Sequence, residues 1–279
     1  MSVPHWLDLD GTSNTRDVGG LPLGSGGVVC SGRLLRSDNL QALSPADVHR
    51  LVVQCRLQTV IDLRTTGEVT HEGPTALSHL RGVAVHHLSL FPEPVEPPEA
   101  NRRRSAAELV GGDTDTDAAV VLPWQDRASE RAQASARTTY LRYLQDRPDS
   151  AVTAVRLVAH TNGASLIHCA AGKDRTGVIV ALALSEVGVD RDAIVTDYAA
   201  TGERVQRVLA RLAASPTYAR DEGLDDVDRH RPRPATMRGL LEDLDIRSGG
   251  PSAWLRANGW TDEDAAALRR SLVGPPDGA

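Results

Sequence analysis

The stretch Ala164-Ser-Leu-Ile-His-Cys-Ala-Ala-Gly-Lys-Asp-Arg-Thr-Gly-Val-Ile-Val180 decides how this chain folds. Leu166 and Ile167 are typical of the end of a short buried strand, and residues 178–184 are typical of the apolar part of a helix. The polar residues between them therefore predict a strand-to-helix turn. Such a turn directs several backbone N–H groups to one point, at the positive end of a helix dipole. We expect an anion site there.

The side chains at the two ends of this turn predict the chemistry of the site. Cys169 opens the turn and Arg175 closes it. The small residues Ala170, Ala171 and Gly172 allow the backbone to wrap closely around an oxyanion, and a guanidinium can hold two oxygens of that anion at once. A thiol in this positive field is expected to ionise easily. The result is a nucleophile aimed at a phosphate.

Lys173 and Asp174 complete the phosphate-binding turn. Lys173 is the only lysine in a chain with 31 lysines and arginines. Its compact ammonium group suits a phosphate oxygen or a second anionic group of a substrate, although chance under a skewed codon usage remains the alternative. A nucleotide-binding P-loop is excluded, because Ile167 stands where its first glycine is needed and Asp174 where it needs Ser or Thr.

The Cys-x5-Arg pattern, with His168 before it and Thr176-Gly177 after it, resembles the signature loop of the protein tyrosine phosphatase superfamily. Further motifs resemble those of the bacterial tyrosine phosphatase-like family, which includes lipid and tyrosine phosphatases of intracellular pathogens. These motifs are Asn14 to Gly20, Arg36 to Asp38, Ile61 to Arg64 and His168 to Gly177. The resemblance covers most of the chain from residue 14 onward.

Strands that alternate with helices predict an α/β fold with a largely parallel central sheet. The resemblance implies the three-layer fold of the protein tyrosine phosphatases, with helices flanking the sheet. We expect one phosphatase domain over residues 1–279, with a helical lid or flexible insertion at 91–135 and a helical part at 235–272. The pattern predicts strands at 28–37 and 57–63, and helices that begin at Ser44-Pro45, at Ser135 and at Asp149.

The expected mechanism needs neither a metal ion nor a cofactor, because the cationic loop neutralises the phosphate. Cys169 would attack phosphorus and form a phosphocysteine, while Arg175 and the N–H groups of residues 170–175 hold the oxygens. Thr176 can donate a hydrogen bond to the thiolate, and His168 is expected to orient the loop by bonding to backbone. Motif positions imply that three further residues support the loop: Arg16, Asp17 and Arg36.

The general acid is the least defined part of the predicted site, since no Trp-Pro-Asp tripeptide is present. The candidates are Asp174, inside the loop, and Asp62, at the end of a strand that should open on the same face. The sequence favours Asp174. Asp62 could instead be a structural partner of Arg64 or Arg36.

Composition narrows the class of partner. A formal net charge of -6 argues against general binding to nucleic acid or to an anionic membrane. An odd number of cysteines argues against a disulfide framework, and neither a secretory leader nor a membrane span is recognisable, so a cytoplasmic enzyme is expected. The partner is a phosphorylated substrate.

The substrate itself stays open at the level of sequence. Phosphotyrosine, phosphoserine or phosphothreonine, and phosphoinositides all fit the loop. An aromatic content of 3% favours a small metabolite, such as a sugar phosphate or nucleotide, because few rings are available to line a phosphotyrosine slot. A phosphate-binding module without turnover is the alternative outside enzymes.

Overall fold

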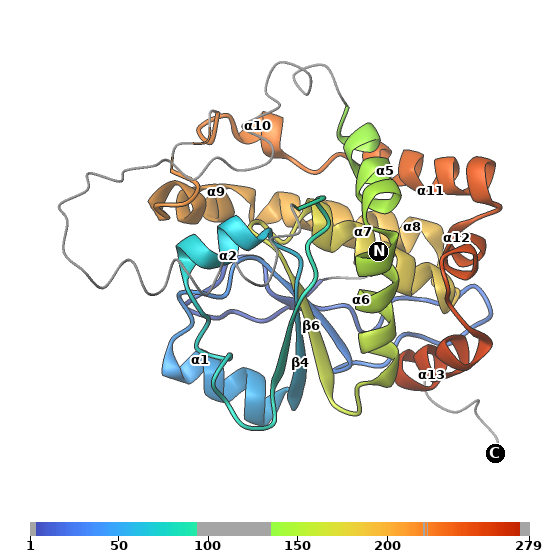
Figure 1. The fold of residues 1–279 in the computed structure, drawn as a ribbon, viewed down its shortest axis with the longest axis horizontal. Coiled ribbons are helices and arrows are strands. Elements are labelled where there is room, and N and C mark those ends of the chain that lie inside the picture. Colours follow the sequence, from blue (N-terminus) through green and yellow to red (C-terminus); the bar gives the residue numbers. More distant parts are fainter. Residues whose placement is uncertain (1–3, 94–134, 220, 222, 274–279) are drawn as a thin grey trace, which may run out of the picture.

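A mixed sheet of six strands forms the centre of the part of the chain that the computed structural model describes, which is residues 4–93, 135–219, 221 and 223–273. The strand order is β1-β2-β3-β6-β4-β5, in which β3, β6, β4 and β5 are parallel and β1 and β2 are antiparallel additions at one edge. The strands are β1 (His5–Trp6), β2 (Arg16–Asp17), β3 (Leu34–Ser37), β4 (Leu57–Asp62), β5 (Ala84–His87) and β6 (Ala164–His168). The predicted α/β fold with a largely parallel sheet is confirmed (Figure 1).

Helices cover both faces of this sheet (Figure 1). One face carries α1 (Pro45–His49), which continues as the π-helical turn η1 (Arg50–Gln54). The other carries α5 (Ala136–Asp146), α6 (Pro148–His160), α7 (Asp174–Glu186), α8 (Arg191–Ala200), α11 (Pro234–Ser248), α12 (Pro251–Ala257) and α13 (Asp262–Leu272). Four further short elements are α2 (Thr66–Glu72), the 3-10 turn η2 (Thr201–Glu203), α9 (Val205–Ala214) and α10 (Val227–His230).

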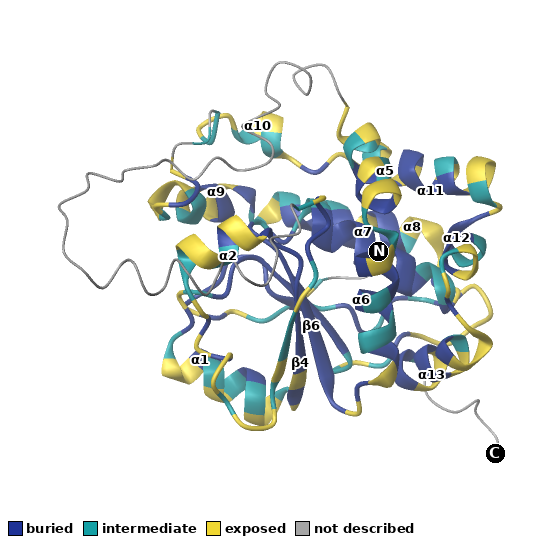
Figure 2. Cartoon of the chain, viewed as in Figure 1, coloured by how far each residue is buried: buried dark blue, intermediate teal, exposed yellow. Residues whose placement is uncertain are grey.

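The strand pattern explains this layering, because successive side chains of a strand point to opposite faces of a sheet. Leu34, Ile61 and Ile167 pack into the larger apolar core, on the α7 side. Their chain neighbours Leu35, Val60 and Leu166 pack into a second core, with Leu51 of η1. Figure 2 shows that α7 is buried, whereas outer helices such as α11 and α13 alternate buried and exposed faces.

The predicted helix starts at Ser44 and Ser135 are observed. Ser44 is the N-cap of α1, and its hydroxyl accepts a hydrogen bond from the Asp47 N–H in a capping box with Pro45 in the first turn. Ser135 caps α5 in the same way, through the Thr138 N–H. The predicted strand at 28–37 is too long, because a turn at Ser31-Gly32, with Gly32 at φ +71°, delays the start of β3 until Leu34.

The lid predicted at residues 91–135 lies almost entirely outside the described residues. The cysteines at 30, 55 and 169 are free thiols. No helix of the described ranges combines the length and the apolarity that crossing a bilayer requires.

The strand register places three chain segments at one edge of the sheet. Ser37 of β3 and Asp62 of β4 both pair with His168 of β6, so the carboxyl ends of these strands are level. The residues that follow them therefore meet at that edge, which is where open α/β sheets bind ligands.

Candidate active site

The loop of residues 169–175 leads from β6 into the first turn of α7, and the surrounding protein holds it by its carbonyl oxygens. These contacts are Asn39 N–H to Ala170 O (3.0 Å), Asn14 Nδ2 to Ala171 O (2.9 Å) and Arg36 Nη2 to Gly172 O (2.9 Å). Within the described ranges, the N–H groups of residues 170–173 have no protein acceptor. Because the carbonyls are bonded outward, these N–H groups are not used by the protein itself, which is the arrangement that an anion site requires.

Gly172 lets the loop lie directly against the end of β3. Its φ is +65°, a left-handed conformation that favours glycine. A Cβ atom at this position would lie 2.3 Å from the Ser37 carbonyl oxygen, which is far inside van der Waals contact. No other residue fits here without moving the loop.

Behind the loop, two buried arginines share one buried carboxylate. Asp197 of α8 accepts from Arg16 Nε at 2.8 Å and from Arg36 Nη1 at 2.5 Å. Burial raises the pKa of the Asp197 carboxyl, but the two guanidinium groups outweigh it and hold the pKa below its usual range. Burial and repulsion by Arg36 lower the pKa of Arg16 to about 10, which leaves Arg16 charged at neutral pH. Two arginines share a single carboxylate directly behind the loop.

Asn14 connects this trio to the loop. Its Oδ1 accepts from Arg16 Nη1 at 2.6 Å, and its Nδ2 donates to the loop carbonyls of Ala171 and Gly172. Its own N–H donates to Asp38, and the side chain is fully buried. The motif from Asn14 to Gly20 therefore holds the loop in place through Asn14 and Arg16.

Cys169 lies on the inner side of the loop, facing a cavity of about 280 Å³. The thiol is 2% exposed, and its Sγ accepts a hydrogen bond from Thr176 Oγ1 at 3.3 Å. The cavity is lined by loop residues and by apolar side chains of other segments, chiefly Phe91, Tyr143, Val205, Val208, Leu209, Leu212 and Tyr218. A small polar floor with apolar walls is a common form of ligand site.

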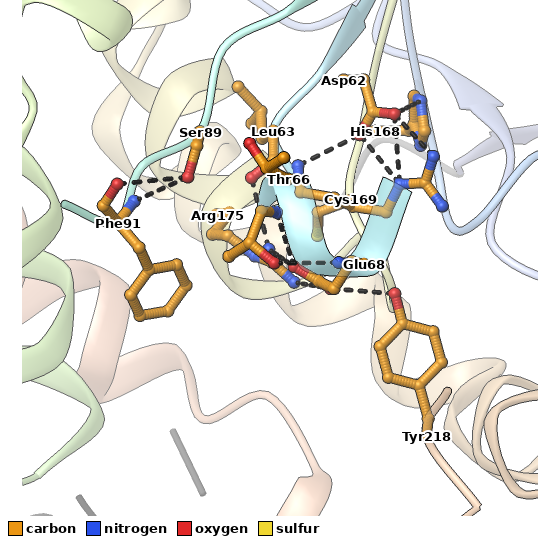
Figure 3. Close-up of polar contacts among 12 residues, drawn as sticks. Asp62, Leu63, Thr66, Glu68, Ser89, Phe91, His168, Cys169, Arg175 and Tyr218 are labelled. Carbon is orange, nitrogen blue, oxygen red and sulfur yellow. Dashed lines mark hydrogen bonds and ion pairs between the residues drawn. The ribbon is translucent and has the colours of Figure 1, made fainter. Parts of the chain in front are cut away.

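Arg175 is fixed by an acid that sequence reasoning did not assign to the site. Its Nη1 and Nη2 donate to the two carboxylate oxygens of Glu68 at 2.6 and 2.9 Å, and Nη1 also donates to the Leu63 carbonyl (Figure 3). Tyr218 donates to the same carboxylate at 2.8 Å. Burial opposes the charge of Arg175, but Glu68 overcomes this and holds the arginine pKa well above its ordinary value. Arg175 lines the cavity, and these contacts fix the plane of its guanidinium group.

Lys173 and Asp174 both line the cavity. Lys173 Nζ donates to the His230 carbonyl at 2.8 Å and lies 3.4 Å from Asp174 Oδ2. The other oxygen of Asp174 accepts a hydrogen bond from the buried hydroxyl of Tyr140. The structure therefore brings a carboxylate and an ammonium group to the rim of the loop, beside Cys169.

Asp62 does not line the cavity. It receives hydrogen bonds from Arg64 Nε and Nη2, at 2.9 and 2.6 Å, and its Oδ2 lies 3.6 Å from His168 Nε2 (Figure 3). Burial favours its neutral form, but His168 and Arg64 overcome this and hold the carboxyl pKa far below its usual range. An acid so strongly ionised and so enclosed is poorly suited to donating a proton to a leaving group.

His168 and Asp17 make different kinds of contact. The ring of His168 lies beside Asp62, and its nitrogens have no hydrogen bond of ordinary geometry in the described ranges, although an interaction with the Cys169 backbone raises the ring's pKa. Burial lowers its pKa to about 4, so it is neutral at pH 7. The Asp17 carboxylate accepts from Gly19 and Gly32 N–H groups, and thus stabilises a turn and not the loop.

The residues that sequence reasoning did not assign to the site come from distant segments. Glu68 belongs to a recognisable sequence pattern, because Thr65 and Glu68 form the capping box of α2. This pattern predicts the start of a helix, but it does not indicate a contact with Arg175. Asp197, Tyr140, Tyr198 and Tyr218 stand in helical or loop sequence without a motif. Nothing in the local pattern places them beside the loop.

Comparison with known proteins agrees with this geometry. The sequence model of the tyrosine phosphatase family matches residues 7–274. The chain is 33% identical over 269 residues to a Cupriavidus necator protein assigned by name to the tyrosine-protein phosphatases, covering 93% of this chain and 82% of that protein. It is 30% identical over 215 residues to the triple specificity protein phosphatase PtpB of Mycobacterium tuberculosis, covering 74% and 72%.

A shorter match, 38% identical over 123 residues and covering 42% of each chain, is to a tyrosine-protein phosphatase of Nostoc commune. The match to the family extends over nearly the whole chain, and it includes the loop between β6 and α7 with Cys169 and Arg175. This protein belongs to the tyrosine phosphatase family and is a phosphomonoesterase.

Proposed function

We propose that this enzyme hydrolyses phosphate monoesters through a phosphocysteine intermediate on Cys169. One observation carries the proposal. Cys169 lies in a loop whose carbonyl oxygens accept hydrogen bonds from the surrounding protein, and Glu68 fixes the arginine of that loop. Such a loop supplies oriented N–H groups and a cation before the substrate arrives. Preorganised donors of this kind stabilise the charge that develops on transferring phosphoryl oxygens.

In the first step, the Cys169 thiolate donates an electron pair to phosphorus, so that a P–S bond forms as the P–O bond to the leaving group breaks. The leaving oxygen takes a proton from a carboxylic acid. Arg175 and the N–H groups of residues 170–175 hold the remaining phosphoryl oxygens. In the second step, water attacks phosphorus and gives a proton to the same carboxylate. The P–S bond breaks and the thiolate returns, while the hydrogen bond from Thr176 stabilises its charge.

We assign the general acid to Asp174. It lines the cavity beside Cys169, whereas Asp62 is enclosed by Arg64 and His168 outside the cavity. Replacement of a general acid is expected to lower the rate by about 10²–10⁴ for substrates with poor leaving groups, and far less for those with good ones. Asp174→Asn should therefore discriminate between alkyl and nitrophenyl phosphates, and Asp62→Asn should not.

The cavity walls favour substrates whose phosphate is attached to an apolar or aromatic group. Few aromatic residues occur in the chain, but Phe91, Tyr143 and Tyr218 line this cavity, together with apolar side chains of α9. The low aromatic content therefore gives no support to a sugar phosphate. We infer phosphotyrosine as the main substrate. Phosphoserine, phosphothreonine and phosphoinositides remain candidates, since a relative is named a triple specificity phosphatase.

The test is release of phosphate from a phosphotyrosine peptide, a matched phosphoserine peptide, phosphoinositide vesicles and a sugar phosphate, each with the wild-type enzyme and with Cys169→Ser. We expect the phosphotyrosine peptide to be the best substrate and Cys169→Ser to be inactive. Activity retained by Cys169→Ser would contradict the phosphocysteine mechanism. Tight binding of phosphopeptide without any turnover would favour a phosphate-binding module instead.

A further inference from the structure

A chain of two tyrosine hydroxyls ends on the carboxylate of Asp174. Tyr140 of α5 donates a hydrogen bond to Asp174 Oδ1, and its hydroxyl oxygen lies 2.8 Å from the hydroxyl oxygen of Tyr198 in α8. Both rings are buried, with exposed fractions of 1% and 2%. The hydroxyls are thus shielded from bulk water, and their direction is set by one another and by Asp174.

The count of protons fixes the direction of these hydrogen bonds. A tyrosine hydroxyl has a single proton to donate. Since the proton of Tyr140 is used on Asp174, the contact between the two tyrosines must be donated by Tyr198. Burial and the neighbouring Asp174 raise the pKa of Tyr140 well above its ordinary value, so this donor is protonated at neutral pH.

Packing also holds the two rings in place. The rings of Tyr140 and Tyr198 meet edge to face, with centroids 6.3 Å apart. The Tyr198 ring also lies against Gly177 of α7, where a Cβ atom would come within 2.9 Å of its Cδ2. The next residue back in the chain is Asp197, which holds Arg16 and Arg36 behind the phosphate loop. The same turn of α8 therefore supports both the loop and the Asp174 side chain.

The hydrogen bond from Tyr140 distinguishes the two oxygens of Asp174. Oδ1 is occupied as an acceptor, whereas Oδ2 lies 3.4 Å from Lys173 Nζ. Lys173 and Asp174 both line the cavity. With the proton on Oδ2, the hydrogen bond from Tyr140 to Oδ1 is kept, whereas a proton on Oδ1 would require the Tyr140 hydroxyl to turn and donate to Tyr198 instead.

We infer that Tyr140 and Tyr198 are positioning residues that hold Asp174 with Oδ2 as its proton-carrying atom. This inference rests on the proposed function, in which Asp174 protonates the leaving oxygen. Neither tyrosine touches the substrate phosphate in this role. Their contribution is to the orientation of the acid, so their loss should resemble a weak form of the loss of Asp174.

The experiment compares p-nitrophenyl phosphate, which needs little protonation of its leaving group, with a simple alkyl phosphate, which needs much. Tyr140→Phe is expected to lower kcat for the alkyl ester about tenfold, as for loss of one hydrogen bond to a charged group, and to leave KM unchanged. The loss with p-nitrophenyl phosphate should be less than about threefold. Tyr198→Phe should show the same selectivity with a smaller loss, of about threefold on the alkyl ester.

A double-variant comparison separates orientation of Asp174 from general support of the fold. In the Asp174→Asn background, Tyr140→Phe should cause no further loss on the alkyl ester, because the acid that it orients is already absent. Ser150→Ala is the matched control: it removes a buried hydroxyl of α6 that has no hydrogen-bond partner in the described ranges, and it should not change the ratio of the two rates.

Equal losses on both substrates in Tyr140→Phe, or a full additional loss in the Asp174→Asn background, would overturn the inference. Equal losses on both substrates in Asp174→Asn alone would overturn the assignment of the acid, and this inference with it. Failure of the proposed function is separate, since it would appear as phosphatase activity that survives Cys169→Ser.

Discussion

Arg175 and Glu68 form a two-point ion pair in which both side chains are buried. The guanidinium donates to the two carboxylate oxygens at 2.6 and 2.9 Å, and the exposed side-chain fractions are 7% and 0%. The partners lie 107 residues apart in sequence. The position of the Arg175 guanidinium is therefore set in part by the first turn of α2, outside the signature loop.

Glu68→Gln is expected to lower the free energy of unfolding by about 3–5 kcal/mol, because it leaves a buried guanidinium without its counter-charge. Turnover should fall as well, since the plane of Arg175 is no longer fixed. Urea denaturation at pH 7 measures the first effect and hydrolysis of p-nitrophenyl phosphate the second. Asp192→Asn is the control, because its pair with Arg238 is largely exposed and should contribute about 1 kcal/mol or less. Equal effects of the two substitutions would contradict this account.

Gly172→Ala tests how closely the loop must lie against β3. The added Cβ would meet the Ser37 carbonyl oxygen, so the loop has to move away from the carbonyl contacts that orient it. Displacements of about 1 Å in an active site can cost about 100-fold, and we expect at least that loss in kcat/KM.

The matched control for this substitution is Gly188→Ala, at a glycine that is also left-handed, with φ +84°, but has nothing within 4 Å of the added Cβ. It should lower stability by about 1–2 kcal/mol through backbone strain and leave kcat/KM unchanged. If Gly172→Ala remained fully active, the close approach of loop and strand would not be required.

The phosphate loop could be predicted from sequence because its parts are contiguous. Cys169, Arg175 and Thr176 lie within eight consecutive residues, so a strand-to-helix turn is enough to bring their backbones together. The parallel sheet was also predictable, because periodicity and alternation are local properties. The sequence also indicated that Asp62 could be a structural partner of an arginine and not the general acid. Arg64, two residues away, is the partner found in the structure.

The support around the loop could not be predicted, because it depends on which polar residues of distant segments meet. Asn14 contacts a carbonyl 157 residues away, and Asp197 bonds two arginines more than 160 residues before it. A sequence shows which residues are charged, but it does not show which of them will become partners once the chain has folded. The position of His230, whose carbonyl accepts a hydrogen bond from Lys173, could likewise not be predicted, because no motif in its stretch of sequence points to the loop.

Stability should depend on pH through His168. Its folded pKa of about 4 lies below the ordinary value of 6.5, because burial disfavours the charged ring. Between these values the unfolded chain binds a proton that the folded protein does not, so the free energy of unfolding falls as pH drops from about 6.5 to about 4. A pKa shift of this size changes the free energy of unfolding by about 3 kcal/mol.

Urea unfolding of the wild-type protein and of His168→Gln at several pH values between 4 and 7 measures this contribution. The variant should have a lower stability at pH 7 and a shallower decline toward acid. An unchanged slope in the variant would mean that other groups cause the decline.

The hydrogen bond from Thr176 to the Cys169 sulfur, at 3.3 Å, should matter most when the thiolate leaves phosphorus. Thr176→Val keeps the shape of the side chain and removes the donor. The second step is then expected to slow by about tenfold, as for loss of one hydrogen bond to a charged atom, while the first step changes less.

Rapid mixing with p-nitrophenyl phosphate should show a burst of nitrophenol equimolar with the enzyme, followed by a slow steady state. Thr196→Val, in an exposed position of α8, is the control and should keep the wild-type time course. A variant at Thr176 whose first turnover slows as much as its steady state would show that this hydroxyl acts on formation of the intermediate instead.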